Sequence, residues 1–285
     1  MSERMTAQSL KGAKGQTPLV WITAYDYTAA RLAEEAGVDV ILVGDSVGTT
    51  LMGYPSTIPV TLDNMIYHAT LVRRGAPNTM MVVDLPFLTY TNARDALANA
   101  GRIMQETLAE AVKLEGGRRV LEAVEALVRH DIPVVGHLGL TPQSLHTMGG
   151  YRVQARTHDS IQALVEDARA LTEAGISALV LEGIPDRVAA YVTQEVHVPT
   201  IGIGAGNQTD GQVLVFHDCI GLSAHLPKFA KPFADVRTAT LEGLRRYRRE
   251  VQTRAFPDDE HSYHVTDKEW QAFWSEVERR SPSPS

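Results

Sequence analysis

Apolar, strand-like runs alternate with amphipathic helical segments along most of the chain, and many of these runs end in a polar side chain. The run VDVILVGDSVG (38–48) ends at Asp45 and Ser46, and TMMVVDLP (79–86) stops at Asp84. A continuous apolar, β-branched run of this kind is typical of a parallel strand buried on both faces. Because carboxylates are costly to desolvate, their recurrence at strand ends needs a common cause.

The later runs AVKLEGG, PVVGHLG and ALVLEGI show the same pattern. AVKLEGG carries Lys113 and Glu115, which are two positions apart and therefore project from the same face of a strand. PVVGHLG presents His137, and ALVLEGI presents Glu182. Charged or polar side chains thus stand at the ends of many strands that lie far apart in the sequence.

The alternation amounts to roughly eight βα units, which is typical of a parallel (β/α)8 barrel of about 250 residues. An open doubly wound sheet is the alternative, but such a sheet concentrates its site at one switch point. In a barrel the carboxyl ends of all strands converge on one mouth, so the distribution of polar residues favours the barrel. The expected strand runs cover residues 19–26, 38–48, 79–86, 111–117, 133–139, 178–184, 199–206 and 219–223, the last being the weakest.

The barrel domain is expected to span residues 1–254 and to include a short helix within residues 2–14 that closes its bottom. Residues 255–285 are expected to form a C-terminal extension with a helix over about 267–280 and a disordered end.

The helix expected in the extension has a capping-box pattern, with Thr266 followed three positions later by Glu269. Its apolar residues recur at helical spacing, which predicts a stripe that docks on the barrel or on a neighbouring subunit. The stripe consists of Trp270, Phe273, Trp274 and Val277.

Composition excludes several other kinds of protein. The formal net charge of −7 and the lack of a long basic run argue against nucleic acid as a partner. No apolar run approaches the roughly 20 residues that cross a bilayer, and the N-terminal residues lack the apolar core of a signal peptide. The single cysteine, Cys219, suits a reducing compartment. We therefore expect a soluble cytoplasmic protein that does not associate with membranes.

A shared mouth would bring Asp45, Asp84, Glu115 and Glu182 together with Lys113, and it would carry an excess of negative charge. Several carboxylates cannot all stay ionised side by side without a counter-charge. Ligands that are all oxygen atoms favour Mg²⁺ over zinc. The pattern therefore predicts a magnesium site with coordination positions left for a chelating substrate.

Each of these residues, taken singly, also has a purely structural interpretation. Asp45 and Ser46 could cap the next helix, and Asp84 could be a turn residue. Lys113 and Glu115 could form a structural ion pair. Their occurrence together at the ends of several strands favours a common site instead.

Other polar or glycine-rich positions are assigned weaker roles. His137 is expected to lie behind the acids and to line the pocket. The segment IGIGAGN comes close to a dinucleotide-binding GxGxxG pattern, but Asn207 stands where the third glycine belongs. We expect this segment to form part of the site wall. Structural packing is the expected role of Tyr25 and Asp26.

Taken together, the motifs GDSVG, VDLPF, VKLEGG, GHLGLTPQ, GGYRVQAR, LVLEGIP and IGIGAGNQTDGQ resemble those of the ketopantoate hydroxymethyltransferase family. The resemblance is specific, because the motifs agree in identity, order and spacing, and it extends from about residue 10 to about residue 264. It implies that a hydroxymethyl group passes from 5,10-methylenetetrahydrofolate to 3-methyl-2-oxobutanoate in the presence of Mg²⁺. The products are 2-dehydropantoate and tetrahydrofolate, in the biosynthesis of pantothenate and coenzyme A.

The resemblance also implies a homo-oligomer, commonly a decamer, and a role for each of six residues. It implies that Asp45, Asp84 and Glu115 bind the metal, with Glu115 acting through water if not directly. It implies that the substrate is bound by Asp45, Ser46, Asp84 and Lys113. Glu182 is the residue that it implies as the proton acceptor.

These roles agree with the chemistry of the residues. The C3 proton of the oxoacid is too weakly acidic for a carboxylate in water, so positive charge must stabilise the enolate. Lys113 could add charge-assisted hydrogen bonds to the same oxygens.

Three other functions stay open from the residues alone. Lys113 could be the Schiff-base nucleophile of a class I aldolase on the same barrel. The site could belong to another Mg²⁺-dependent lyase or mutase that acts on an oxoacid. The chain could also be a metal-binding or metabolite-binding protein without catalytic activity.

Overall fold

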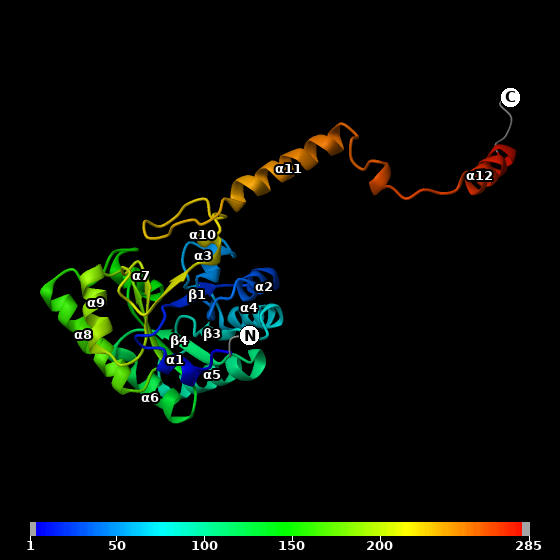
Figure 1. The fold of residues 1–285 in the computed structure, drawn as a ribbon. Helices are drawn as coiled ribbons and strands as arrows, with labels where there is room; N and C mark the ends of the chain where they lie inside the picture. Colours follow the sequence, from blue (N-terminus) through cyan, green and yellow to red (C-terminus); the bar gives the residue numbers. More distant parts are fainter. Residues whose placement is uncertain (1–3, 281–285) are drawn as a thin grey trace. The chain divides into compact units, whose positions relative to one another are not determined.

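The computed structural model describes residues 4–280 and contains a barrel of parallel strands surrounded by helices (Figure 1). Each strand pairs with the next, and β8 pairs with β1, so the barrel is closed. This confirms the predicted (β/α)8 barrel. The strands are β1 (Leu19–Thr23), β2 (Val40–Val43), β3 (Met80–Asp84), β4 (Ala111–Glu115), β5 (Val134–Gly139), β6 (Ala178–Glu182), β7 (Thr200–Ile203) and β8 (Gly211–Leu214).

Helices connect the successive strands from β1 to β7 and cover the outside of the barrel, whereas a loop without a helix joins β7 to β8. The longer ones are α2 (Tyr27–Glu35), α4 (Leu62–Gly75), α5 (Ala93–Thr107), α6 (Leu121–Arg129), α8 (His158–Glu173) and α9 (Asp186–Glu195). Shorter helices are α1 (Ala7–Gly12), α3 (Val47–Thr50), α7 (Leu145–Met148) and α10 (Phe216–Cys219). Side-chain caps define several helix starts, as at α2, where the Asp26 carboxylate accepts from the Ala29 N–H.

Side chains alternate along each strand between the barrel interior and the outer face. On β3, Met80 and Val82 belong to the inner apolar cluster, whereas Met81 and Val83 belong to the outer one. Asp84 ends β3 in the inward phase. The inner cluster therefore fills the lower part of the barrel, and polar side chains follow it toward the carboxyl ends of the strands.

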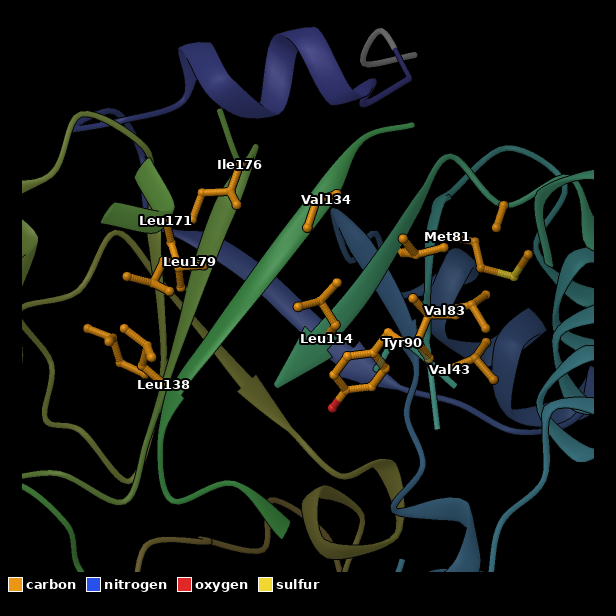
Figure 2. Close-up of a cluster of buried hydrophobic side chains, with 14 of the residues drawn as sticks. Val43, Met81, Val83, Tyr90, Leu114, Val134, Leu138, Leu171, Ile176 and Leu179 are labelled. Atoms are coloured by element: carbon orange, nitrogen blue, oxygen red, sulfur yellow. The ribbon is translucent and has the colours of Figure 1, made fainter. Parts of the chain in front are cut away.

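The outer cluster fills the space between strands and helices. Figure 2 shows part of it, with Met81, Val83 and Leu114 from the strands and Leu171 from α8. All four side chains are at most 1% exposed. Burying an aliphatic side chain of this size contributes about 1.5–3 kcal/mol, so this layer holds the strand ends in a fixed arrangement.

The N-terminal helix closes the bottom of the barrel, as predicted. Leu10 of α1 is fully buried and packs in the inner cluster with Leu19 and Trp21 of β1. This apolar plug leaves the opposite end, where the strands finish, as the open mouth.

The prediction for the eighth strand is wrong. Residues 219–223 do not form a strand, and α10 occupies the start of this segment. The last strand is Gly211–Leu214, which closes on β1 through the pairing of its first residue with Leu19. A Cβ atom on that first residue would lie 2.6 Å from the Leu19 carbonyl oxygen, so the tight closure requires glycine.

The chain divides into two compact units, one up to Ala234 and one from Asp235 onward. The predicted boundary after residue 254 placed the preceding helix with the barrel, whereas α11 (Val236–Gln252) falls in the second unit. That unit also contains α12 (Asp267–Arg280), which confirms the predicted helix. The end that was expected to be disordered, 281–285, lies outside the described residues. Between residues 4 and 280, no helix is long and apolar enough to cross a bilayer.

Candidate active site

Strand register brings the polar residues of the inward phase into one layer at the mouth. Asp84 on β3 is the direct neighbour of Lys113 on β4, and Glu115 is the direct neighbour of His137 on β5. Glu182 ends β6 opposite a glycine of β5. All of these positions were predicted from the sequence, and the structure brings them together.

The glycine opposite Glu182 allows the two strands to approach at this point. Gly139 has a positive φ of 94°, and a Cβ atom on it would lie 2.2 Å from the Glu182 carbonyl oxygen. Glycine is the residue that tolerates both conditions. The position of Glu182 therefore depends on a neighbour without a side chain.

Asp45 follows β2 and lies directly beside Asp84. Its backbone N–H donates to Oδ2 of Asp84 over 3.0 Å, and its own side chain accepts from Gln143 Nε2 over 2.8 Å. Asp45 is 3% exposed. The Asp45 carboxylate therefore points into the site. It accepts a hydrogen bond from a residue far away in the sequence and does not cap the N-terminus of a helix.

Lys113 is buried between acids and an imidazole. Its Nζ lies 3.2 Å from Asp84 Oδ2 and 3.2 Å from His137 Nδ1. The same ring nitrogen lies 3.4 Å from Glu115 Oε1, and Nε2 of the ring lies 3.3 Å from Glu182 Oε2. His137 therefore links Glu115 to Glu182, which is a more central position than the sequence predicted for it.

Glu182 is the most open of these acids. Its side chain is 15% exposed, compared with 1% for that of Glu115 and 3% for that of Asp84. A carboxylate at this rim can contact a molecule that enters the mouth.

Gln143 and Tyr90 join the acids, although no role was predicted for them from the sequence. The Gln143 backbone N–H donates to Glu115 Oε2 over 3.0 Å. The Tyr90 hydroxyl donates to Gln143 Oε1 and accepts from the Glu115 N–H over 3.3 Å. Their position in the sequence could have indicated this role, because each follows the end of a strand by a few residues. Tyr90 ends the segment VDLPFLTY, and Gln143 ends the segment GHLGLTPQ.

Ser46 lies next to Asp45, at the start of α3. Its hydroxyl makes no cap hydrogen bond with that helix and instead pairs with the Tyr25 hydroxyl over 2.7 Å. Tyr25 is fully buried, and burial raises the pKa of its hydroxyl to about 12. Tyr25 therefore stays neutral and holds Ser46, whereas Asp26 caps α2 as expected for a structural residue.

Burial and mutual repulsion destabilise the charged forms of two acids. Burial, together with the carboxylates of Glu115 and Asp84, raises the pKa of Asp45 well above its usual range. Burial also raises the pKa of Asp84, although Lys113 opposes this effect. Burial would likewise raise the pKa of Glu115, but its interactions with His137 and Lys113 bring it below the usual value.

The two basic groups respond in the opposite direction. Burial would lower the pKa of Lys113, but the carboxylates of Asp84 and Glu115 raise it overall. Burial and the charge of Lys113 would lower the pKa of His137, yet Glu115 and Glu182 raise it to about 9. Both groups are therefore cationic at neutral pH and partly offset the carboxylates.

The described residues 4–280 contain no group of three or more His, Cys, Asp or Glu side chains arranged as a ready-made metal site. The predicted set of Asp45, Asp84 and Glu115 is thus not a preformed set of three ligands. Two observations fit a cation that is shared with a substrate. Asp84 Oδ1 is buried and has no hydrogen-bond partner in the described part of the chain, and a nearby positive charge would lower the raised pKa values of Asp45 and Asp84.

A closed (β/α)8 barrel with buried acids, a lysine and a histidine at the carboxyl ends of its strands has the architecture of a barrel enzyme. The model of the family described as ketopantoate hydroxymethyltransferase matches residues 4–259. The chain belongs to the ketopantoate hydroxymethyltransferase family, and it is a transferase.

Curated relatives agree with this assignment. The chain is 50% identical over 261 residues to a 3-methyl-2-oxobutanoate hydroxymethyltransferase of Thermus thermophilus, covering 91% of this chain and 100% of the relative. It is 49% identical over 259 residues to the enzyme of the same name from Geobacillus sp. WCH70, covering 90% and 93%.

Two solved structures share the fold at low identity. Phosphonopyruvate hydrolase in complex with oxalate and Mg²⁺ superposes with a TM-score of 0.60 at 15% identity, covering 97% of this chain and 99% of the other. A 2,3-dimethylmalate lyase, described as a member of the PEP mutase/isocitrate lyase superfamily, gives 0.58 at 19% identity, covering 96% and 95%. These similarities concern the barrel fold alone.

Proposed function

We propose that the chain transfers a hydroxymethyl group from 5,10-methylenetetrahydrofolate to 3-methyl-2-oxobutanoate, as the reaction that yields 2-dehydropantoate for pantothenate and coenzyme A biosynthesis. The observation that carries the proposal is the meeting of Asp45, Asp84, Lys113 and Glu115 in one buried layer, with Glu182 at its open rim. The names of relatives that are about half identical point to the same reaction.

Asp45, Asp84 and Glu115 are the residues that would hold Mg²⁺. Oxygen ligands suit this ion, which commonly keeps positions for water or substrate. When bound, Mg²⁺ would supply positive charge beside the keto oxygen and so lower the free energy of an enolate. Asp84 Oδ1, which is buried and has no hydrogen-bond partner within residues 4–280, supports this assignment.

Lys113 and Ser46 would orient the oxoacid. The Lys113 ammonium is held among carboxylates and can donate to the carboxylate or keto oxygen of the substrate. The Ser46 hydroxyl is fixed by Tyr25 and can donate to the substrate carboxylate. Two fixed donors restrict the substrate to one orientation, which lowers the entropic part of the barrier.

Glu182 would remove the C3 proton. Its carboxylate is the most open of the acids at the mouth, and the imidazole of His137 lies 3.3 Å away, where it can hold the carboxylate in position. Water adds to the methylene carbon of the folate, and both C–N bonds of that carbon break, so that the two nitrogens take up the protons of the water and tetrahydrofolate leaves. The electron pair of the broken C–H bond then forms the new C–C bond to the released carbon, and the oxygen that came from water takes the proton back from Glu182 and becomes the hydroxyl group.

The Schiff-base alternative is less well supported by the geometry. A Schiff base requires a neutral amine, whereas, against the effect of burial, Asp84 and Glu115 raise the pKa of Lys113. An ammonium group held in this way is suited to donating hydrogen bonds to an oxoacid and not to attacking its carbonyl carbon.

We also propose that the chain forms a homo-oligomer. Trp270, Phe273 and Trp274 lie on one face of α12 and are each at least 50% exposed. Large aromatic residues grouped in this way mark an interaction site. The face would contact further copies of the chain, in a decamer if the assembly follows the family resemblance.

A turnover assay tests the proposed reaction directly. With Mg²⁺, 3-methyl-2-oxobutanoate and 5,10-methylenetetrahydrofolate, we expect formation of 2-dehydropantoate, and omission of the folate should abolish it. Product formation without folate would favour a lyase or mutase. Complete inactivity of correctly folded protein would favour a binding protein.

A further inference from the structure

Gln143 makes four hydrogen bonds around two of the acids. Its backbone N–H donates to Glu115 Oε2 over 3.0 Å. Its side-chain Nε2 donates to Asp45 Oδ2 over 2.8 Å and to the Leu85 carbonyl oxygen over 3.0 Å. Its Oε1 accepts from the Tyr90 hydroxyl over 2.5 Å. At 4% exposure, this residue is as buried as the acids that it contacts.

The hydrogen-bond network determines how the amide group is turned. Because the Asp45 carboxylate and the Leu85 carbonyl oxygen are acceptors, the NH₂ group must face them, and the Oε1 atom then faces the Tyr90 hydroxyl, which donates to it. Both NH₂ protons and the acceptor are satisfied in this orientation. The amide cannot turn over without placing its oxygen against the Asp45 carboxylate.

The acids on either side are held differently. Glu115 accepts from the Gln143 N–H through Oε2, and its Oε1 lies 3.4 Å from His137 Nδ1. Asp84 is held through Oδ2 by the Asp45 N–H and Lys113, and its Oδ1 has no hydrogen-bond partner among residues 4–280. A buried oxygen without a partner is rare in a folded protein, and this one belongs to an acid directly beside Asp45, where a cation could bind.

We infer that Gln143 is a positioning residue for the proposed reaction. It holds Asp45 through its side chain and Glu115 through its backbone, so that both carboxylates present oxygens to one Mg²⁺ ion. This inference rests on the proposed function of the site. Tyr90 acts through Gln143, because its hydroxyl fixes the amide that in turn fixes Asp45.

Substitutions at this position separate positioning from simple packing. Gln143→Glu keeps the shape of the side chain but replaces the donor that faces Asp45 with a carboxylate oxygen. Gln143→Ala removes the side chain and leaves the backbone N–H that Glu115 accepts from. Replacing a residue that holds a metal ligand in place typically lowers metal affinity or activity by about 10–100-fold.

Calorimetric titration with Mg²⁺ in the presence of 3-methyl-2-oxobutanoate tests the inference. We expect Gln143→Ala to bind Mg²⁺ about 10–100-fold more weakly than the unmodified protein, and Gln143→Glu to bind it no more tightly than Gln143→Ala. Gln154→Ala is the matched control, because this glutamine lies in the same connection between β5 and α8 and its side chain donates to the Arg152 carbonyl. We expect the control to bind Mg²⁺ with unchanged affinity.

Thermal unfolding without Mg²⁺ serves as the structural measurement. A fall in Tm for Gln143→Ala with no change in Mg²⁺ affinity would overturn the inference, because the residue would then only stabilise the loop. If Gln143→Ala does not fold, Tyr90→Phe replaces it, since that variant removes the hydroxyl that orients the amide, together with the longer hydrogen bond that this hydroxyl accepts from the Glu115 N–H. Weaker Mg²⁺ binding by Tyr90→Phe would support the inference, and unchanged binding would overturn it.

Failure of the inference can be told apart from failure of the proposed function. If the unmodified protein binds Mg²⁺ with the oxoacid and the Gln143 variants match Gln154→Ala, the positioning role alone is wrong. If the unmodified protein does not bind Mg²⁺ at all, both the role and the proposed chemistry are wrong.

Discussion

The backbone N–H of Asp45 donates a hydrogen bond of 3.0 Å to the side chain of Asp84, a residue 39 positions further along the chain. The bond links the loop after β2 to the end of β3, and it places two acids beside each other at the barrel mouth. Had these residues been far apart, no common cation could reach both. Their proximity is the geometric basis for the proposed metal and substrate site.

Asp84→Ala should weaken Mg²⁺ binding by more than the roughly 10–100-fold that is typical of residues that merely orient a ligand. The substitution removes both a predicted ligand oxygen and the acceptor of the Asp45 N–H. Calorimetry with Mg²⁺ and the oxoacid measures the effect. Asp159→Ala is the control, because the side chain of Asp159 is fully exposed. Equal affinities in the two variants would remove Asp84 from the site.

Borohydride should not trap a covalent adduct between 3-methyl-2-oxobutanoate and Lys113. Despite its burial, the carboxylates of Asp84 and Glu115 keep the lysine protonated, and an ammonium group cannot form a Schiff base. Mass spectrometry of peptides from the treated protein provides the measurement, with a known Schiff-base aldolase as the positive control. A reduced adduct located at Lys113 would establish the aldolase mechanism in place of the proposed one.

Asp210→Asn should destabilise the barrel by about 1–3 kcal/mol at neutral pH. The Asp210 carboxylate accepts from Lys14 Nζ and from the Thr200 N–H, each over 2.8 Å, and from the Gly15 N–H over 3.0 Å. It thereby ties the segment that follows α1 to β7. Denaturant unfolding measures the difference, and Asp159→Asn is the exposed control. A loss no larger than that of the control would contradict the assigned role.

The effect of Asp210 should depend on pH. Burial would raise the pKa of Asp210, but Lys14 and the backbone donors lower it overall. The charged form is therefore favoured in the folded state, and its contribution is fully present above the unfolded aspartate pKa of about 4. As the pH falls through the lower folded pKa, the contribution is lost. Unfolding curves of the unmodified protein and Asp210→Asn should thus converge in acid, and a constant difference would show that the charge is not responsible.

Replacing Trp270 and Trp274 of α12 with serine should reduce the size of the assembly. Both side chains are 50% exposed, and subunit contacts would bury them. Light scattering coupled to size-exclusion chromatography measures the mass. An unmodified protein that runs as a monomer would contradict the proposed homo-oligomer, and an unchanged oligomer in the double variant would show that α12 is not the contact.

Much of the barrel and its mouth could be predicted because the signals are local. The inward phase of β3 and β4 can be read from the alternation of side chains, so Asp84, Lys113 and Glu115 follow from their spacing. The closing strand is different. Gln212 of β8 is exposed, and β8 starts at a glycine that the approach to β1 requires, so it lacks the apolar run by which other strands are recognised.

The contacts of Gln143 and Tyr90 could not be predicted, because they depend on how two loops fold over the mouth. Gln143 lies 98 positions from Asp45 and 53 from Tyr90. Such distant pairings are set by tertiary structure and leave no periodic pattern. The position of His137 could be predicted only in part. The alternation along β5 predicts that its side chain points inward, but it does not predict that Glu115 and Glu182 lie on either side of it.

The most direct measurement follows exchange of the C3 proton of 3-methyl-2-oxobutanoate with deuterated water by NMR, with Mg²⁺ present and folate absent. The unmodified protein should catalyse this exchange, and Glu182→Gln should slow it by about 10²–10⁴-fold while it still binds Mg²⁺ and the oxoacid. Glu122→Gln, on the exposed face of α6, should exchange at the unmodified rate. Equal exchange by Glu182→Gln and the unmodified protein would contradict the assignment of Glu182 as the proton acceptor, and with it the account of how this mouth activates an oxoacid.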